Sequence, residues 1–76
     1  MNYVVLPSSN DSDAEFFISK WYVKVGDKDR LGDALVAYEE EKTIVDLYSD
    51  YDGVIVEIYV HEEETAAPGT KICAIE

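Results

Sequence analysis

Hydrophobic and polar residues alternate most clearly on either side of a short charged stretch in the middle of the chain. Four apolar residues there occupy alternate positions: Leu35, Ala37, Val45 and Leu47. This period of two is typical of half-buried β-strands. The alternation breaks at residues 39–42, which are three glutamates followed by a lysine. The pattern therefore predicts a β-hairpin with strands at residues 34–40 and 43–48 and with Lys42 at its tip.

The other apolar stretches predict short strands at residues 3–6, 15–23, 54–60 and 71–76. The segments between them are rich in Gly, Pro, Asp, Asn and Ser, which favour turns. Residues 8–14 are expected to form a polar surface loop. Four glycines are expected to lie in turns: Gly26, Gly32, Gly53 and Gly69. No segment has a helical period, so the fold is expected to be all-β.

An internal repeat organises these strands. Sliding the sequence by 37 residues (53 − 16) aligns residues 16–39 with residues 53–76 without a gap. Six residues of the first copy meet identical residues in the second: Ile18, Tyr22, Val23, Gly32, Ala37 and Glu39. Neither copy can bury an apolar face alone. We therefore expect two sheets that face each other across a shared core, related by an approximate two-fold axis and joined by the hairpin.

Composition limits the functions that such a chain can have. Its 76 residues are expected to form one small domain, residues 1–76, with little room for a deep catalytic pocket. Seventeen acidic and six basic residues give a formal charge of −11, which repels nucleic acid and anionic membranes and favours basic protein partners. The hydrophobic share of 47% argues against disorder. The chain thus has the composition of a folded, acidic, β-rich domain.

Nothing in the sequence directs the chain to export or to a membrane. Its first residues lack a basic stretch followed by an apolar run, and no stretch approaches transmembrane length. The single cysteine, Cys73, cannot form an internal disulfide, which favours a reducing compartment. We expect a cytoplasmic location.

Lys42 is the main candidate for a functional residue. Because three carboxylates precede it, its amine is expected to stay protonated and to be a poor nucleophile unaided. Another enzyme can easily reach it, however, and acylation would remove its charge and turn it into a tether. Taken alone, a lysine on a polar turn is more often a solubilising residue. Residues 39–41 are either a solvated face or a recognition surface, and charge complementarity favours recognition.

Other conspicuous residues have structural interpretations. Trp21 and Cys73 align with apolar residues of the other copy, so both are expected to pack in the core. Residues 62–64 are three adjacent glutamates without the ligand spacing of a calcium loop, and no metal site is expected. His61 has no visible partner and is assigned no catalytic role.

Four stretches give the chain a family resemblance: ISKWYVKVGD at residues 18–27, LGDAL at 31–35, EEEKT at 39–43 and DGVI at 52–55. They resemble the lipoyl domain of 2-oxo acid dehydrogenase complexes, a member of the biotinyl/lipoyl attachment family, over nearly the whole chain. The spacings agree, with 16 residues (42 − 26) before Lys42 and 11 (53 − 42) after it. The fold implied is a flattened β-barrel, or barrel-sandwich hybrid, of two four-stranded antiparallel sheets.

The chain departs from the usual family pattern at several positions. Glu41 stands where Asp usually precedes the lysine, and Thr43 where Ala often follows it. Phe16 occupies the place of a usual glycine, and Glu63 aligns with Gly26 of the other copy. Biotin carriers have methionines on both sides of the lysine, whereas the only methionine here is Met1. The resemblance therefore implies lipoic acid rather than biotin.

The resemblance implies a non-catalytic carrier, possibly one part of a dihydrolipoamide acyltransferase, that swings lipoic acid on Lys42 between active sites. It assigns recognition of the modified hairpin to Glu39, Glu41 and Thr43, and partner recognition to Asp11, Asp13 and Glu40. The partners implied are a lipoate ligase or octanoyl transferase, a thiamine-dependent 2-oxo acid decarboxylase, a dihydrolipoamide acyltransferase and dihydrolipoamide dehydrogenase. The isolated domain is expected to be monomeric.

Two alternatives remain open at the level of sequence. The chain could be another carrier of the same fold, a biotin carrier or the glycine cleavage carrier protein, although the latter has longer chains with extra terminal elements. It could also be an unmodified module that only binds a partner. The sequence does not name the 2-oxo acid.

Overall fold

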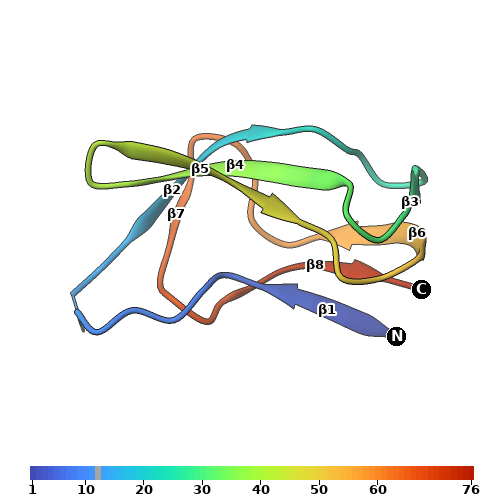
Figure 1. The fold of residues 1–76 in the computed structure, drawn as a ribbon, viewed down its shortest axis with the longest axis horizontal. Helices are drawn as coiled ribbons and strands as arrows, with labels where there is room; N and C mark the ends of the chain where they lie inside the picture. Colours follow the sequence, from blue (N-terminus) through green and yellow to red (C-terminus); the bar gives the residue numbers. More distant parts are fainter. Residues whose placement is uncertain (12) are drawn as a thin grey trace.

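The computed structural model describes residues 1–11 and 13–76, and they form eight β-strands. The strands are β1 (Asn2–Val5), β2 (Phe16–Trp21), β3 (Lys28–Asp29), β4 (Ala34–Glu40), β5 (Thr43–Tyr48), β6 (Gly53–Ile58), β7 (Thr65–Ala66) and β8 (Lys71–Ile75). They form two four-stranded sheets, β1-β8-β6-β3 and β5-β4-β2-β7, in which all pairs are antiparallel (Figure 1). The predicted all-β architecture of two four-stranded sheets is confirmed.

The predicted hairpin strands, residues 34–40 and 43–48, coincide with β4 and β5. The boundaries of the other predicted strands differ from those of β1, β2, β6 and β8 by at most two residues. Two strands of two residues each, β3 and β7, were missed because they lie between turns and have no period of their own. They are related by the repeat, since Lys28 and Thr65 are 37 residues apart.

Backbone hydrogen bonds repeat with the same shift of 37 residues. Tyr22 donates to Leu35 at 2.8 Å, and Tyr59 donates to Ile72 at 2.8 Å. The turn of each half also pairs with a strand of the other half: Gly26 donates to Ile55, Glu63 donates to Ile18, and both distances are 2.8 Å. The two copies therefore interlock, as the sequence repeat predicts.

The core lies between the sheets, and both β4 and β8 are buried on both of their faces. Leu35 to Tyr38 are all at most 6% exposed, and Ile72 to Ile75 are all 0% exposed. The expectation that Leu35 and Ala37 mark a half-buried strand is therefore wrong for β4. The outer face is covered by a tyrosine: Tyr22 donates its hydroxyl at 2.9 Å to Asp46, the residue opposite Ala37.

Strand β5 differs from its partner because it lies at the edge of its sheet. Val45 lies opposite the buried Tyr38, on the same face as Leu47, but it is 38% exposed at this edge, whereas Leu47 packs against the core. The predicted core positions of Trp21 and Cys73 are confirmed, with Trp21 half-buried against the core and Cys73 fully buried. Burial raises the pKa of the Cys73 thiol to about 11, so this thiol stays neutral. In the described part of the chain, no helix could cross a membrane.

Candidate functional site

A two-residue turn connects β4 to β5 and presents Lys42. Glu40 and Thr43 form the last pair of the hairpin, so Glu41 and Lys42 alone make the turn. The turn projects at one end of the molecule, whereas both chain termini lie at the opposite end (Figure 1). Lys42 is exposed, and no carboxylate within residues 1–11 and 13–76 forms an ion pair with it. Its amine is therefore open to an approaching enzyme.

The turn requires an unusual backbone conformation at Glu41, whose φ is 55°. Two-residue hairpin turns need positive φ at their first position, which Gly, Asn and Asp adopt more readily than Glu. The strand pairing enforces this conformation, because β4 is hydrogen-bonded to β5 on one side and to β2 on the other. The position of Lys42 is therefore fixed by the sheet and not by the turn residues alone.

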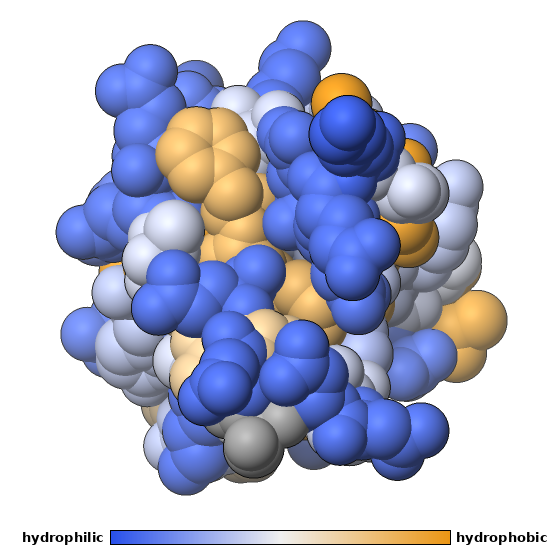
Figure 2. Space-filling model, turned by 90° about the vertical axis from the view of Figure 1, so that its left-hand side faces the viewer, coloured by the Kyte–Doolittle hydropathy of each residue, from blue (hydrophilic) through white to orange (hydrophobic). Residues whose placement is uncertain are grey.

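An acidic hollow with a volume of about 330 Å³ lies beside the turn. Its lining comes from the loop before β2 and from the end of the hairpin: Ser9, Asp11, Asp13, Ala14, Glu15, Glu40 and Glu41. Figure 2 looks at this end of the molecule, where hydrophilic groups dominate. The three predicted partner-recognition residues, Asp11, Asp13 and Glu40, thus lie together beside Lys42. Glu15 was not predicted, although its position directly before β2 places it there.

The loop is folded by its own hydrogen bonds. The backbone N–H of Asp13 donates to Asp11 Oδ1 at 2.9 Å, and the N–H of Ala14 donates to the Asp11 carbonyl at 3.1 Å. The N–H of Asp11 donates to Ser9 Oγ at 3.1 Å. One carboxylate oxygen of Asp11 therefore helps to shape the loop to which Asp11 belongs. The predicted loop at residues 8–14 also includes Ser12, which lies outside the described residues.

Glu39 is separated from the other predicted recognition residues. It does not line the hollow, since side chains alternate between faces along β4 and Glu40 takes the side that faces the loop. Glu39 is half-buried on the outer face, between Phe17 of β2 and Ile44 of β5. Thr43 is exposed opposite Glu40. The predicted recognition residues therefore occupy two faces of the hairpin.

Three of the four predicted turn glycines have the expected backbone. Gly26, Gly32 and Gly69 have φ of 98°, 92° and 81°. The assignment of Gly53 to a turn is wrong, because it begins β6 without a positive φ. A Cβ at this position would lie 2.5 Å from the carbonyl oxygen of Glu76. Gly53 is required for a close approach between neighbouring chain segments.

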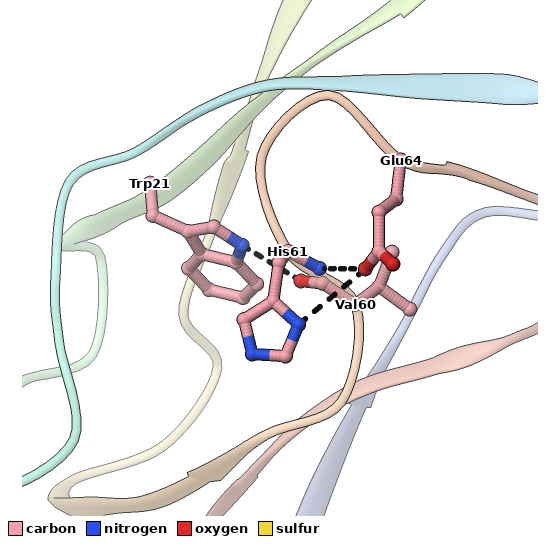
Figure 3. A network of polar contacts seen from close by, with 4 residues as sticks. All are labelled: Trp21, Val60, His61 and Glu64. Atoms are coloured by element: carbon pink, nitrogen blue, oxygen red, sulfur yellow. Dashed lines mark hydrogen bonds and ion pairs between the residues drawn. The ribbon is translucent and has the colours of Figure 1, made fainter.

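His61 has a partner that the sequence did not reveal. Its Nδ1 lies 3.4 Å from Glu64 Oε1, and its backbone N–H donates to the same oxygen at 2.6 Å (Figure 3). This backbone bond, with a smaller effect of the ring, lowers the pKa of the Glu64 carboxyl. Directly before His61, the carbonyl of Val60 accepts a hydrogen bond of 2.9 Å from the Trp21 indole N–H. Lys24 and Asp27 make the equivalent backbone-to-carboxylate bond in the first copy at 3.0 Å, so the contact shapes a turn.

No group of three or more His, Cys, Asp or Glu residues suited to a metal ion occurs among the described residues. Together, the described residues offer an exposed amine on a paired hairpin turn and an acidic hollow beside it. Such an arrangement can accept a covalent modification and can bind a basic partner.

The profile of the biotin/lipoyl family, described as biotin-requiring enzyme, matches residues 2–75. Among curated proteins, the chain is 32% identical over 72 residues to the dihydrolipoyllysine-residue acetyltransferase component of the acetoin cleaving system of Bacillus subtilis, covering 95% of this chain and 18% of that protein. It is 36% identical over 62 residues to the lipoamide acyltransferase component of the mitochondrial branched-chain alpha-keto acid dehydrogenase complex of Bos taurus, covering 82% and 13%. The chain spans less than a fifth of the length of these relatives.

A solved structure has the same fold. The lipoyl domain of the 2-oxoglutarate dehydrogenase complex from Azotobacter vinelandii superposes with a TM-score of 0.82 at 24% identity, covering 97% of this chain and 94% of that domain. The match of the family profile to nearly the whole chain agrees with this fold and with the hairpin geometry. The chain belongs to the biotinyl/lipoyl attachment family and is a lipoyl domain of the type found in the acyltransferase components of 2-oxo acid dehydrogenase complexes.

Proposed function

We propose that Lys42 is the attachment site for lipoic acid and that the domain carries acyl groups and electrons between the enzymes of a 2-oxo acid dehydrogenase complex. The observation that carries this proposal is the exposed Lys42 amine on a two-residue turn, at the opposite end of the molecule from both termini. The domain itself is not catalytic and acts as one part of a larger acyltransferase. The enzymes that meet it are a lipoate ligase or octanoyl transferase, a thiamine-dependent decarboxylase, the acyltransferase and dihydrolipoamide dehydrogenase.

The residues around Lys42 suit an amide-linked group. In amide formation, the Lys42 ammonium first loses a proton, and Nζ then replaces the activating group on the carboxyl carbon of lipoic acid, and this group leaves with its bonding electrons. The amide is uncharged, so the formal charge changes from −11 to −12. No ion pair with a described residue has to break in this step. When attached, lipoic acid supplies a cyclic disulfide that accepts an acyl group with two electrons. The chain contributes a fixed base for the arm, because β4 is paired on both sides.

The position of the lysine within the turn tests this proposal. The double variant Glu41→Lys, Lys42→Glu keeps the composition and net charge but moves the amine by one residue. Side chains at neighbouring positions leave the hairpin in different directions, so we expect modification by a lipoate ligase to fall at least tenfold. The measurement is the rate of lipoyl incorporation by intact mass, with circular dichroism as the control for folding. An unchanged rate in a folded variant would show that placement by the turn does not matter.

We also propose that the decarboxylase recognises the acidic hollow through basic side chains at the entrance to its active site. Opposite charges speed the encounter of two proteins and reject wrong partners. The support is that Asp11, Asp13, Glu15, Glu40 and Glu41 line one hollow beside the attachment site.

The triple variant Asp11→Asn, Asp13→Asn, Glu40→Gln should slow reductive acylation of the lipoylated domain several-fold at low salt. The difference should shrink at high salt, because exposed charges are screened. A matched variant with the same loss of charge outside the hollow, Asp50→Asn, Glu57→Gln, Glu76→Gln, should have a smaller effect. Equal acylation rates of the wild type and the first variant at low salt would leave the hollow without a recognition role.

A further inference from the structure

Three residues form a row on the outer face of the hairpin sheet. The strand register places Phe17 of β2 opposite Glu39 of β4, and Glu39 opposite Ile44 of β5. Phe17 is 37% exposed and Ile44 is 63% exposed, although both are large and apolar. We call Phe17, Glu39 and Ile44 the outer strip. It contains an acidic residue between two apolar ones.

The neighbouring rows explain why the outer strip is uncovered. The adjacent residues Ile18 and Tyr38, which pair with each other, point the opposite way and are 0% and 6% exposed. Further along the outer face, the Tyr22 side chain reaches Asp46 and covers the sheet. This cover ends before the strip. The end view in Figure 2 shows hydrophobic groups exposed between hydrophilic ones at this end of the molecule.

The outer strip is close to Lys42 and turns away from the acidic hollow. Ile44 is two residues from Lys42, which corresponds to about 7 Å along a strand. Glu40 and Glu41 line the hollow, whereas Glu39 does not. Two different surfaces therefore lie on either side of one lysine: a mainly acidic one and a partly apolar one.

The reach of the lysine decides which enzyme must cover the strip. An unmodified lysine side chain extends roughly 6 Å from the backbone, on a flexible four-carbon stem. An enzyme that acylates its amine must therefore approach the turn within that distance and will lie over the flanking residues. An enzyme that acts on the far end of the completed arm can work at a greater distance from the hairpin.

We propose that the outer strip is the docking surface for the enzyme that attaches the acyl group to Lys42. This rests on the proposed function. The partner's facing surface is apolar opposite Phe17 and Ile44, and it carries a basic side chain opposite Glu39. An apolar contact centred on one charge pair suits a brief but specific encounter, because the charge fixes the register and the apolar groups supply the contact area.

The test compares ligase kinetics on matched variants. Phe17→Thr with Ile44→Thr removes the apolar groups and places threonine, which favours strands, at both exposed positions. Val25→Thr with Leu31→Thr is the control, because these side chains are 56% and 68% exposed outside the hairpin. With a lipoate ligase and lipoate, we expect kcat/KM to fall about tenfold in the strip variant, through KM, and to stay within twofold in the control. Glu39→Lys should also raise KM.

Two readouts separate the possible failures. Equal kcat/KM for the wild type and a folded strip variant would overturn the docking surface alone, while no lipoyl group on wild-type Lys42 would overturn the proposed function as well. The lipoylated strip variant, prepared with excess ligase, should be reductively acylated by the decarboxylase at the wild-type rate. If acylation falls while lipoylation is unchanged, the strip belongs to the decarboxylase and the assignment is wrong. The conservative pair Phe17→Leu, Ile44→Val should restore ligase kinetics.

Discussion

Asp29 and Ser49 are buried together behind the base of the hairpin, and each is only 2% exposed. Ser49 Oγ contacts Asp29 Oδ2, lies 3.0 Å from the Tyr51 carbonyl oxygen and accepts the Tyr51 N–H at 3.1 Å. A hydroxyl has one proton to donate. If Asp29 is ionised, the Ser49 hydroxyl can donate its proton either to the Asp29 carboxylate or to the Tyr51 carbonyl, but not to both. If Asp29 is protonated, Asp29 donates to Ser49 and Ser49 donates to Tyr51, so both bonds form.

Burial also favours the protonated form. It raises the pKa of the Asp29 carboxyl, and the nearby charges of Asp33 and Asp52 raise it further, against the opposing effect of the Ser49 bond. Asp29 Oδ1 has no hydrogen-bond partner among the described residues. Because the pKa is higher in the folded chain than in the unfolded chain, this group stabilises the fold at low pH. That contribution is lost as pH rises through the folded pKa.

Asp29→Asn should therefore stabilise the domain at neutral pH. The amide can donate to Ser49 without a proton from solvent, so the gain at pH 7 should be about 1 kcal/mol. Below the ordinary carboxyl pKa of 3.8 the difference between variant and wild type should close. Urea unfolding of both proteins from pH 3 to pH 7 measures this, and comparison at each pH cancels the other carboxyl groups. A variant that is less stable than the wild type at pH 7 would contradict a raised pKa of Asp29 in the folded chain.

At the level of elements, the hairpin could be predicted from sequence because its strands are long and its charged turn interrupts a clear alternation. The burial of β4 on both faces could not, because the Tyr22 cover comes from another part of the chain. The same is true of β3 and β7, whose two residues each become strands only through pairing with β6 and β2. Turns were recognisable wherever glycine supplied a positive φ. Glu63, with φ of 70°, adopts the conformation of its counterpart Gly26 despite its side chain.

Gly53 holds β6 against the end of the chain, so a side chain added at this position should destabilise the domain. Val54 and Glu76 exchange backbone hydrogen bonds of 2.9 Å and 3.0 Å next to it. Gly53→Ala would push a methyl group into the Glu76 backbone, so we expect a loss of about 1 to 3 kcal/mol in the free energy of unfolding.

The control is Val54→Ala, because Val54 is 36% exposed and its truncation creates no clash. It should cost less than 1 kcal/mol. Chemical unfolding of both variants provides the comparison. Equal losses would mean that the close approach at Gly53 is relieved by small shifts of the backbone.

On the scale of the whole molecule, the internal repeat builds one body from two interlocking halves, which the hairpin joins. The hairpin that joins the two halves projects from one end, and the termini leave from the other (Figure 1). A carrier tethered through its termini would thus keep its attachment site pointing away from the tether. The domain has a formal charge of −11, so it is repelled by other acidic surfaces.

The candidate site could be predicted from sequence where its residues are consecutive in the chain. It could not be predicted where its residues come together only through strand pairing. Lys42 and its acidic neighbours are consecutive, so the sequence shows them together. Asp11 and Asp13 lie far from the hairpin in sequence, and only the family resemblance placed them beside it. The outer strip was missed, because Phe17 and Ile44 become neighbours of Glu39 only through the register of three strands.

The most direct test of the account is the site of lipoylation. Wild-type protein is incubated with a lipoate ligase and lipoate, weighed intact, and mapped by proteolysis and mass spectrometry. We predict the gain of one lipoyl group, with loss of one water, on Lys42 only, and no gain in Lys42→Arg. A lipoyl group on Lys20, Lys24, Lys28 or Lys71, or continued modification of Lys42→Arg, would contradict the account.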